Sequence, residues 1–343
     1  METLNREELR MTDINFSKIH QDQNTVLSSV PEPPKYLPGK SIVTTCYRNE
    51  IPSTYILLKE LNRLSINLPI EVFFREGELV EAEIRELSSI WPGNITFKKI
   101  NGDAKNYTDK WGNVKGWSTK VYAVLESAYA ENLWLDSDNF PIRNCVDLFD
   151  DEEYVKKGSL FWRDVYSIDR ADLYCSTSDM WKLFNVTPND GEPFESGQFL
   201  VNKPKVWTQL WLMLYFTEHC DLYYGIGGDA ECWRMAWQHV AIKQNQYHAQ
   251  FNYHASENVP YGFMPYGPFH KGVQNPWHKY GGGTVMVQRD RNGLELFNHR
   301  NIHKFAWTDE NPYNNDVTNE VTYHMILRHM KAKYGVPNAG NSQ

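Results

Sequence analysis

Two carboxylates, Asp136 and Asp138, follow the apolar run 132–135. Acidic side chains separated by one residue at the end of a strand can both reach one divalent cation, the first directly and the second through water or a phosphate oxygen. Mg²⁺ and Mn²⁺ prefer oxygen ligands and accept phosphate oxygens of a substrate in the same coordination shell. The pattern therefore predicts a metal site, and a polar turn after a strand is the alternative interpretation.

Lys120 is the cation that best accompanies such a site. It lies in the segment 116–122, early in an apolar helix. From there its ammonium would pair with a diphosphate as a point charge. A helix lysine that faces solvent fits the same pattern equally well.

Two further acidic segments contain glycine. Glu195 and Gln198 flank a glycine ahead of an expected strand, where the backbone can approach a ligand closely or simply form a loop. Asp229 opens a helix and suits its N-cap, and Glu231 is separately available two residues later. The loop 268–278 supplies imidazoles that would complete a metal shell.

Strand and helix alternate through the first half of the chain, as judged from apolar and β-branched runs and from helical spacing. Strands are expected over 41–46, 71–74, 95–100 and 132–135, and helices over 52–66, 78–90 and 117–130. This alternation predicts an α/β fold with a mostly parallel, Rossmann-like sheet flanked by helices. Ligands bind such sheets at the carboxyl ends of strands, where Thr44, Thr45 and Asp136 fall.

The second half is less regular. Strands are expected over 159–162 and 199–202, helices over 205–218, 230–240 and 317–333, and a long ordered loop over 247–283. Residues 1–38 are polar and end in a proline-rich stretch, which predicts an N-terminal arm and linker ahead of a single folded domain over 39–343.

Composition excludes several classes of protein. The 12 Trp, 20 Tyr and 16 Phe among 343 residues exclude disorder for most of the chain. With 43 acidic against 35 basic residues and a net charge of -8, we expect no nucleic-acid partner. Five cysteines without a CxxC pair argue against a disulfide framework or a Cys-built zinc site. No apolar run reaches the length of a membrane span, so we expect a cytoplasmic protein, or a Golgi lumenal one only if an anchor has been removed.

Five motifs, taken in order, resemble the Mnn1-type α-mannosyltransferases of glycosyltransferase family 71. They are Lys120-Val121-Tyr122-Ala123-Val124, Leu135-Asp136-Ser137-Asp138-Asn139, Phe161-Trp162, Glu195-Ser196-Gly197-Gln198 and Gly228-Asp229-Ala230-Glu231. The resemblance covers about residues 40–240. It implies a GT-A fold whose half 39–140 binds a nucleotide-sugar, and whose half 141–343 lies on the acceptor side and carries the C-terminal loop and helix.

The resemblance also implies the reaction, a metal-dependent transfer of a hexose to a glycan or glycoprotein hydroxyl with retention of configuration. The first expectation is mannose from GDP-mannose, with UDP-galactose or UDP-glucose as the alternative donor. Asp136 and Asp138 would hold Mn²⁺ or Mg²⁺ on the diphosphate, and Lys120 would meet a phosphate or the donor sugar. The other residues implied to line the donor site are Thr44, Thr45, Arg48, Ser137 and Gln198.

Two assignments within this resemblance stay open. A glycogenin-like element, His-Phe-x-Gly-x-x-Lys-Pro-Trp, matches around Gly272 with Phe269 in the histidine column, so His270 next to it is expected as the third metal ligand. Retention is possible by front-face attack or through a carboxylate nucleophile, for which the candidates are Glu195, Asp229 and Glu231.

Two other functions compete with this interpretation. A non-catalytic sugar-binding module would bind glycans without metal or turnover, and the intact Asp-x-Asp pattern argues against it. A nucleotidyltransferase also uses paired aspartates, but it usually has a Gly-rich loop where this chain reads Thr44-Thr45-Cys46-Tyr47-Arg48-Asn49.

Overall fold

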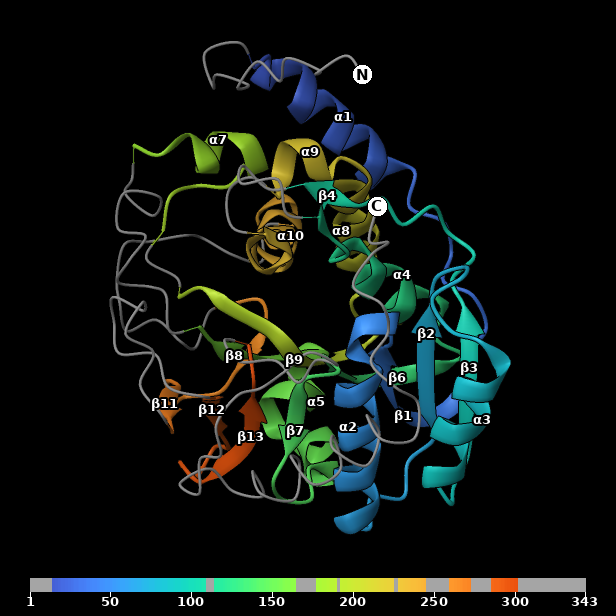
Figure 1. Cartoon of the computed structure of the whole chain (residues 1–343). Coiled ribbons are helices and arrows are strands. Elements are labelled where there is room, and N and C mark those ends of the chain that lie inside the picture. Colours follow the sequence, from blue (N-terminus) through green and yellow to red (C-terminus); the bar gives the residue numbers. More distant parts are fainter. Residues whose placement is uncertain are drawn as a thin grey trace.

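A seven-stranded sheet forms the centre of the molecule in the computed structural model, which describes residues 14–108, 114–164, 177–189, 192–224, 228–244, 259–272 and 285–301 (Figure 1). Its strand order is β10-β8-β9-β6-β1-β2-β3. The strands are β1 (Leu37–Thr45), β2 (Ile70–Phe74), β3 (Ile95–Lys99), β6 (Tyr129–Leu135), β8 (Ser159–Arg163), β9 (Phe194–Asn202) and β10 (Gly262–Phe263). All neighbouring pairs are parallel except that β9 runs antiparallel to both β6 and β8.

The two faces of this sheet pack into separate hydrophobic cores. Ile42 and Val43 are consecutive in β1 and fully buried, and they contribute to different core clusters because side chains alternate across a strand. The buried apolar runs Leu133–Leu135 of β6 and Phe199–Val201 of β9 are typical of strands that are covered on both faces.

Helices cover both faces of the sheet (Figure 1). One core is closed by α2 (Ile51–Arg63), α3 (Glu81–Ile90) and α5 (Glu152–Lys157). The other is closed by α1 (Phe16–Ser28), α4 (Ser118–Glu126), α7 (Asp179–Phe184), α8 (Trp207–Glu218), α9 (Cys220–Tyr223) and α10 (Gly228–Lys243). Two short 3-10 helices, η2 (Arg48–Glu50) and η3 (Val146–Asp150), follow β1 and β7.

A second, antiparallel sheet brings residues 285–299 next to the central sheet. Its order is β11-β12-β13-β7, formed by β11 (Phe269–Lys271), β12 (Val285–Arg289), β13 (Glu295–His299) and β7 (Asn139–Pro141). Because β7 begins directly after Asp138, the pairing of His299 with Asn139 places the end of β13 beside the end of β6. A small hairpin of β4 (Tyr107–Thr108) and β5 (Val114–Lys115) precedes α4.

The α/β fold with a mostly parallel, helix-flanked sheet is confirmed, and it is the sheet expected of a GT-A fold. Most expected elements have bounds that differ by a few residues, and two of these differences lie next to the site. The helix expected to Ala130 ends at Glu126, because β6 already pairs with β1 from Tyr129 onward. Strand β9 begins at Phe194 instead of Phe199, so that the segment expected as a loop is paired backbone.

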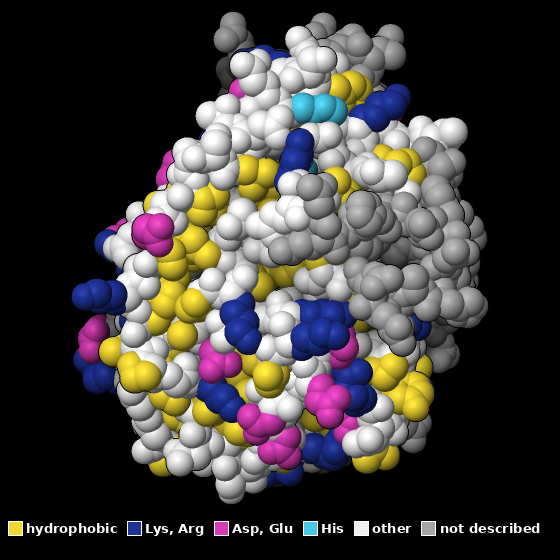
Figure 2. Space-filling model, turned by 180° about the vertical axis from the view of Figure 1, so that it is seen from behind, with side chains coloured by type: hydrophobic (Ala, Val, Ile, Leu, Met, Phe, Trp, Pro, Cys, Tyr) yellow, Lys and Arg dark blue, Asp and Glu magenta, His cyan; other side chains and the backbone are white. Residues whose placement is uncertain are grey.

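Two further expectations concern segments that the structure describes only in part or not at all. The loop expected over 247–283 is described only in part and contains β10 and β11. The helix expected over 317–333 lies outside the described residues. Among the helices that the structure describes, none combines the length and the apolar character that crossing a bilayer requires. On the face shown in Figure 2, Lys and Arg side chains lie among Asp and Glu side chains.

Candidate active site

The candidate site is built at the turn that joins β6 to β7. The backbone N–H of Asp136 donates to the Gly197 carbonyl (2.8 Å), and the N–H of Asn139 donates back to the Asp136 carbonyl (2.9 Å). The Asn139 side-chain amide also donates to the Gly197 carbonyl, at 3.0 Å. These bonds hold the turn against β9 and fix both aspartates at the carboxyl end of β6.

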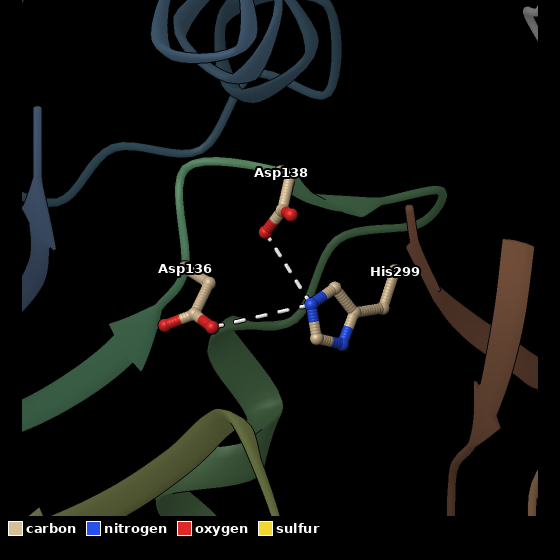
Figure 3. A group of neighbouring side chains, drawn as sticks. All are labelled: Asp136, Asp138 and His299. Carbon is tan, nitrogen blue, oxygen red and sulfur yellow. Dashed lines mark ion pairs between the residues drawn. The ribbon is translucent and has the colours of Figure 1, made fainter. Parts of the chain in front are cut away.

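Asp136, Asp138 and His299 point toward a common centre (Figure 3). One ligand atom from each lies within 4.8 Å of the others. His299 Nε2 is 3.3 Å from Asp138 Oδ1 and 4.0 Å from Asp136 Oδ2. Asp138 is fully buried, whereas the Asp136 side chain keeps 26% of its exposure and so opens the group toward solvent.

This donor set fits a divalent metal ion. Neighbouring ligands of an octahedral ion with bonds of about 2.1 Å lie about 3 Å apart, near the 3.3 Å between Asp138 and His299 and shorter than the 4.0 Å between Asp136 and His299. Two carboxylates with one imidazole suit Mn²⁺. They suit Mg²⁺ less well, because Mg²⁺ prefers oxygen ligands alone. The three side chains would need only small adjustments to share one cation.

The electrostatics of His299 reflect the surrounding carboxylates. Burial alone would lower the pKa of His299, but the charges of Glu195 and Asp138 outweigh it and raise the pKa to about 10. Without a cation, an imidazolium therefore balances the acidic group. A metal bound at Nε2 would take the place of that proton, because a ligating imidazole must be neutral.

Lys120 is buried beside this centre and is fully engaged by protein groups. Its ammonium lies 3.2 Å from Asp136 Oδ1 and 3.0 Å from Asp229 Oδ2. It also donates to the carbonyl (2.7 Å) and hydroxyl (3.0 Å) of Ser196. Burial would lower the pKa of Lys120, but Asp136 and Asp229 raise it, so that the charge persists. Trp134 Nε1 donates to the same Asp136 oxygen at 2.8 Å, which leaves Oδ2 toward His299.

The three candidate nucleophiles occupy different places. Glu195 lies in the site, 3.3 Å from His299 Nδ1. Asp229 was expected as an N-cap, but it lies inside the first turn of α10 and directs its carboxylate to Lys120 and to Trp233 Nε1 (3.4 Å). Glu231 pairs with the buried Arg234 at 2.9 Å. Residues two apart on a helix do not share a face, so Glu231 points away from Asp229.

The residues expected to line the donor site lie along one edge of the sheet. Thr44 and Thr45 end β1 next to the end of β6, since Val43 pairs with Trp134. Arg48 follows in η2, where it pairs with Glu83 of α3 at 3.2 Å.

Two other expected donor residues hold the turns at this edge. The Ser137 hydroxyl donates to Glu50, which ties the turn after β6 to the start of α2. The Gln198 side-chain carbonyl accepts from the Asn139 amide. Their contact with a donor stays a prediction.

The structure brings His299, and not His270, to the two aspartates. His270 lies on β11 opposite Met286, and Met286 is opposite His299, so two strand spacings of about 4.8 Å separate the histidines. Sequence reasoning missed His299 because no metal-ligand spacing connects it with residues 160 positions earlier. The only local signal was a histidine two residues after the apolar pair Leu296-Phe297.

Comparison with known proteins supports the expected resemblance. Residues 39–192 match the sequence model of a family described as "Mannosyltransferase putative". Alpha-1,2-mannosyltransferase MNN2 of Saccharomyces cerevisiae is 24% identical over 330 residues, which cover 81% of this chain and 55% of the yeast protein. Alpha-1,2-mannosyltransferase MNN2 of Candida albicans is 30% identical over 119 residues, covering 33% of this chain and 19% of that protein.

The resemblance to the Mnn1-type α-mannosyltransferases is confirmed by these matches. The chain spans about half the length of the yeast relative, at 55%. Among solved structures, the glycosyltransferase GlyE of Streptococcus pneumoniae TIGR4 aligns over 89% of this chain and 66% of its own, with 14% identity and a TM-score of 0.48.

Proposed function

We propose that this chain is the catalytic part of a metal-dependent glycosyltransferase that moves mannose from GDP-mannose to a hydroxyl of a glycan or glycoprotein, with retention of configuration. One observation carries the proposal, the convergence of Asp136, Asp138 and His299 at the carboxyl end of β6. The names of the related mannosyltransferases support mannose as the sugar.

In this proposal, Asp136, Asp138 and His299 hold Mn²⁺ or Mg²⁺. The bound ion supplies Lewis-acid stabilisation of the nucleoside diphosphate that leaves. The edge formed by Thr44, Thr45 and the loop to Arg48 receives the nucleotide, since ligands of open α/β sheets bind outside the carboxyl ends of the strands.

Lys120 contributes differently from what its sequence context suggests. Four protein oxygens already surround its ammonium, so it neutralises Asp136 and Asp229 instead of reaching freely for a phosphate. Its positive charge offsets the negative charges of the partly exposed Asp136 and the buried Asp229, and its contact with Oδ1 leaves Oδ2 of Asp136 toward the metal centre.

Transfer assays test the proposal. The purified chain is incubated with Mn²⁺, an oligomannoside and either GDP-mannose, UDP-glucose or UDP-galactose, and the product is followed by mass spectrometry and its anomeric configuration by NMR. We expect an α-mannoside from GDP-mannose, loss of product with EDTA, and at least a 100-fold lower rate in Asp138→Asn. Asp22→Asn, whose side chain on α1 is 47% exposed, is the matched control and keeps the wild-type rate.

Three results would count against the proposal. Transfer that persists at full rate in EDTA or in Asp138→Asn would remove the metal from the reaction. Product from a UDP-sugar alone would move the donor to a UDP-hexose. Glycan binding without turnover of any donor would favour the non-catalytic sugar-binding module.

A further inference from the structure

Carboxylates face both nitrogens of the His299 ring. Asp138 Oδ1 is 3.3 Å from Nε2, and Glu195 Oε1 is 3.3 Å from Nδ1 on the opposite side. A histidine that binds a metal through one nitrogen almost always directs its other N–H to a carboxylate, carbonyl or water, which fixes both the tautomer and the orientation of the ring. Glu195 occupies the position of such a partner.

Glu195 is itself held in place by the strand that carries it. Its Oε1 accepts the backbone N–H of Gly197 at 2.8 Å, and its side chain is 10% exposed. The same Oε1 therefore faces both the Gly197 N–H and the His299 ring.

Gly197 shows how closely these groups are packed. A Cβ at this position would lie 2.4 Å from His299 Cε1, 2.6 Å from Nδ1 and 2.9 Å from Glu195 Oε1. Real Cβ atoms do not approach other atoms so closely, so only glycine lets β9 lie against the imidazole. The strand, the carboxylate and the ring form one packed unit behind the metal centre.

We propose that Glu195 is a positioning residue that orients His299 for metal binding, and not the nucleophile of a double displacement. This inference rests on the proposed metal-dependent function. With a cation at Nε2, the Nδ1–H of His299 would be directed to Glu195 Oε1, 3.3 Å away, and the Nε2 lone pair would face Asp136 and Asp138. Retention of configuration then does not depend on a covalent bond from the sugar to Glu195.

Binding of Mn²⁺ alone, measured by EPR titration of free ion, tests this without turnover. Glu195→Ala is expected to weaken Mn²⁺ binding about 10–100-fold, the usual effect of removing such a partner. Glu195→Gln keeps an oxygen that accepts from Nδ1, so it should bind Mn²⁺ much more tightly than Glu195→Ala and keep measurable transfer at saturating Mn²⁺. Glu192 lies three residues before Glu195 and pairs with Arg163. Glu192→Gln loses that ion pair and should bind Mn²⁺ as the wild type does.

A spectroscopic signature adds a second measurement. Pulsed EPR of the wild type should show nitrogen coupling from one imidazole on Mn²⁺, retained in Glu195→Gln and weakened or lost in Glu195→Ala. Circular dichroism and thermal melting establish that each variant is folded, and Glu195→Gln, which has nearly the same shape, serves if Glu195→Ala does not fold.

The opposite pattern would overturn the inference. A nucleophile would leave Mn²⁺ affinity and nitrogen coupling unchanged in both variants, while Glu195→Gln would abolish transfer as completely as Glu195→Ala. If the folded wild type bound no Mn²⁺, or Asp138→Asn bound it equally well, the proposed function would fall and the inference with it. If the wild type binds Mn²⁺ and Glu195→Ala binds it with the same affinity, the inference is refuted and the proposed function stands.

Discussion

Among single substitutions next to the site that keep the three metal ligands, removal of the Lys120 ammonium should lower the stability of the protein most. The Lys120 side chain is 6% exposed and the Asp229 side chain 7%, with 3.0 Å between the charged atoms. Lys120→Met preserves most of the apolar volume but leaves Asp229 and Asp136 without their cation. Breaking a buried ion pair by removing one partner costs about 3–5 kcal/mol.

That cost predicts a measurable loss of stability. With an unfolding entropy of about 2.1 cal/mol/K per residue over 343 residues, each kcal/mol shifts the melting temperature by about 1.4 °C, so Lys120→Met should melt roughly 4–7 °C below the wild type. Guanidinium unfolding in EDTA gives the free energy directly. Lys18→Met, which removes a 4.0 Å pair with Asp22 between two largely exposed side chains of α1, is the control and should cost under about 1 kcal/mol.

A double-mutant cycle separates the ion pair from general packing. Asp229→Asn in the Lys120→Met background removes one of the two stranded charges, so the double variant should be more stable than the sum of single effects predicts. Coupling between residues in contact is typically about 0.5–3 kcal/mol, and we expect a value of at least about 1 kcal/mol. Additive effects, or a loss below about 1 kcal/mol in Lys120→Met, would refute the argument that this lysine is needed to neutralise buried carboxylates.

Three further predictions concern other parts of the molecule. Gly197→Ala should force His299 aside, because its Cβ would lie 2.4 Å from Cε1, and it should cost about 1–3 kcal/mol of stability together with weaker Mn²⁺ binding; unchanged Mn²⁺ affinity would contradict the packing argument. His299→Ala should lower Mn²⁺ affinity by at least about tenfold and His270→Ala should not, and the reverse order in a titration would restore the glycogenin-like assignment. Burial lowers the pKa of His239 to about 4, so on acidification the unfolded chain takes up a proton at this residue before the folded chain does. The free energy of unfolding should therefore fall as the pH drops from 6.5 toward 4, by up to roughly 3 kcal/mol. Denaturant unfolding at several pH values checks this, and His239→Gln should remove most of the difference.

The alternating half of the chain could be predicted because each element carries its own local signal. Strand β1 and helix α2, for example, follow from a β-branched run and from apolar residues at helical spacing. Asp136 and Asp138 were identified for the same reason, since a polar pair directly after an apolar strand marks the edge of a parallel sheet.

The remainder depends on contacts between distant segments. His299 enters the site only because β13 pairs with β7, and no local pattern in 295–299 indicates that pairing. Glu195 was expected in a loop, because the glycine that follows it usually interrupts a strand. Here the glycine is required by the imidazole packed against it, a contact between residues about 100 positions apart.

The central claim is that Asp136, Asp138 and His299 hold one divalent cation for a nucleotide-sugar. A crystal structure of the chain with Mn²⁺ and GDP, with the ion located by anomalous scattering, tests it most directly. The account predicts one anomalous peak bounded by the two carboxylates and His299 Nε2, at about 2.0–2.4 Å from each ligand atom, with diphosphate oxygens completing the shell. A peak at His270, or bound GDP whose diphosphate lies away from Asp136 and Asp138 with no Mn²⁺ between them, would contradict it.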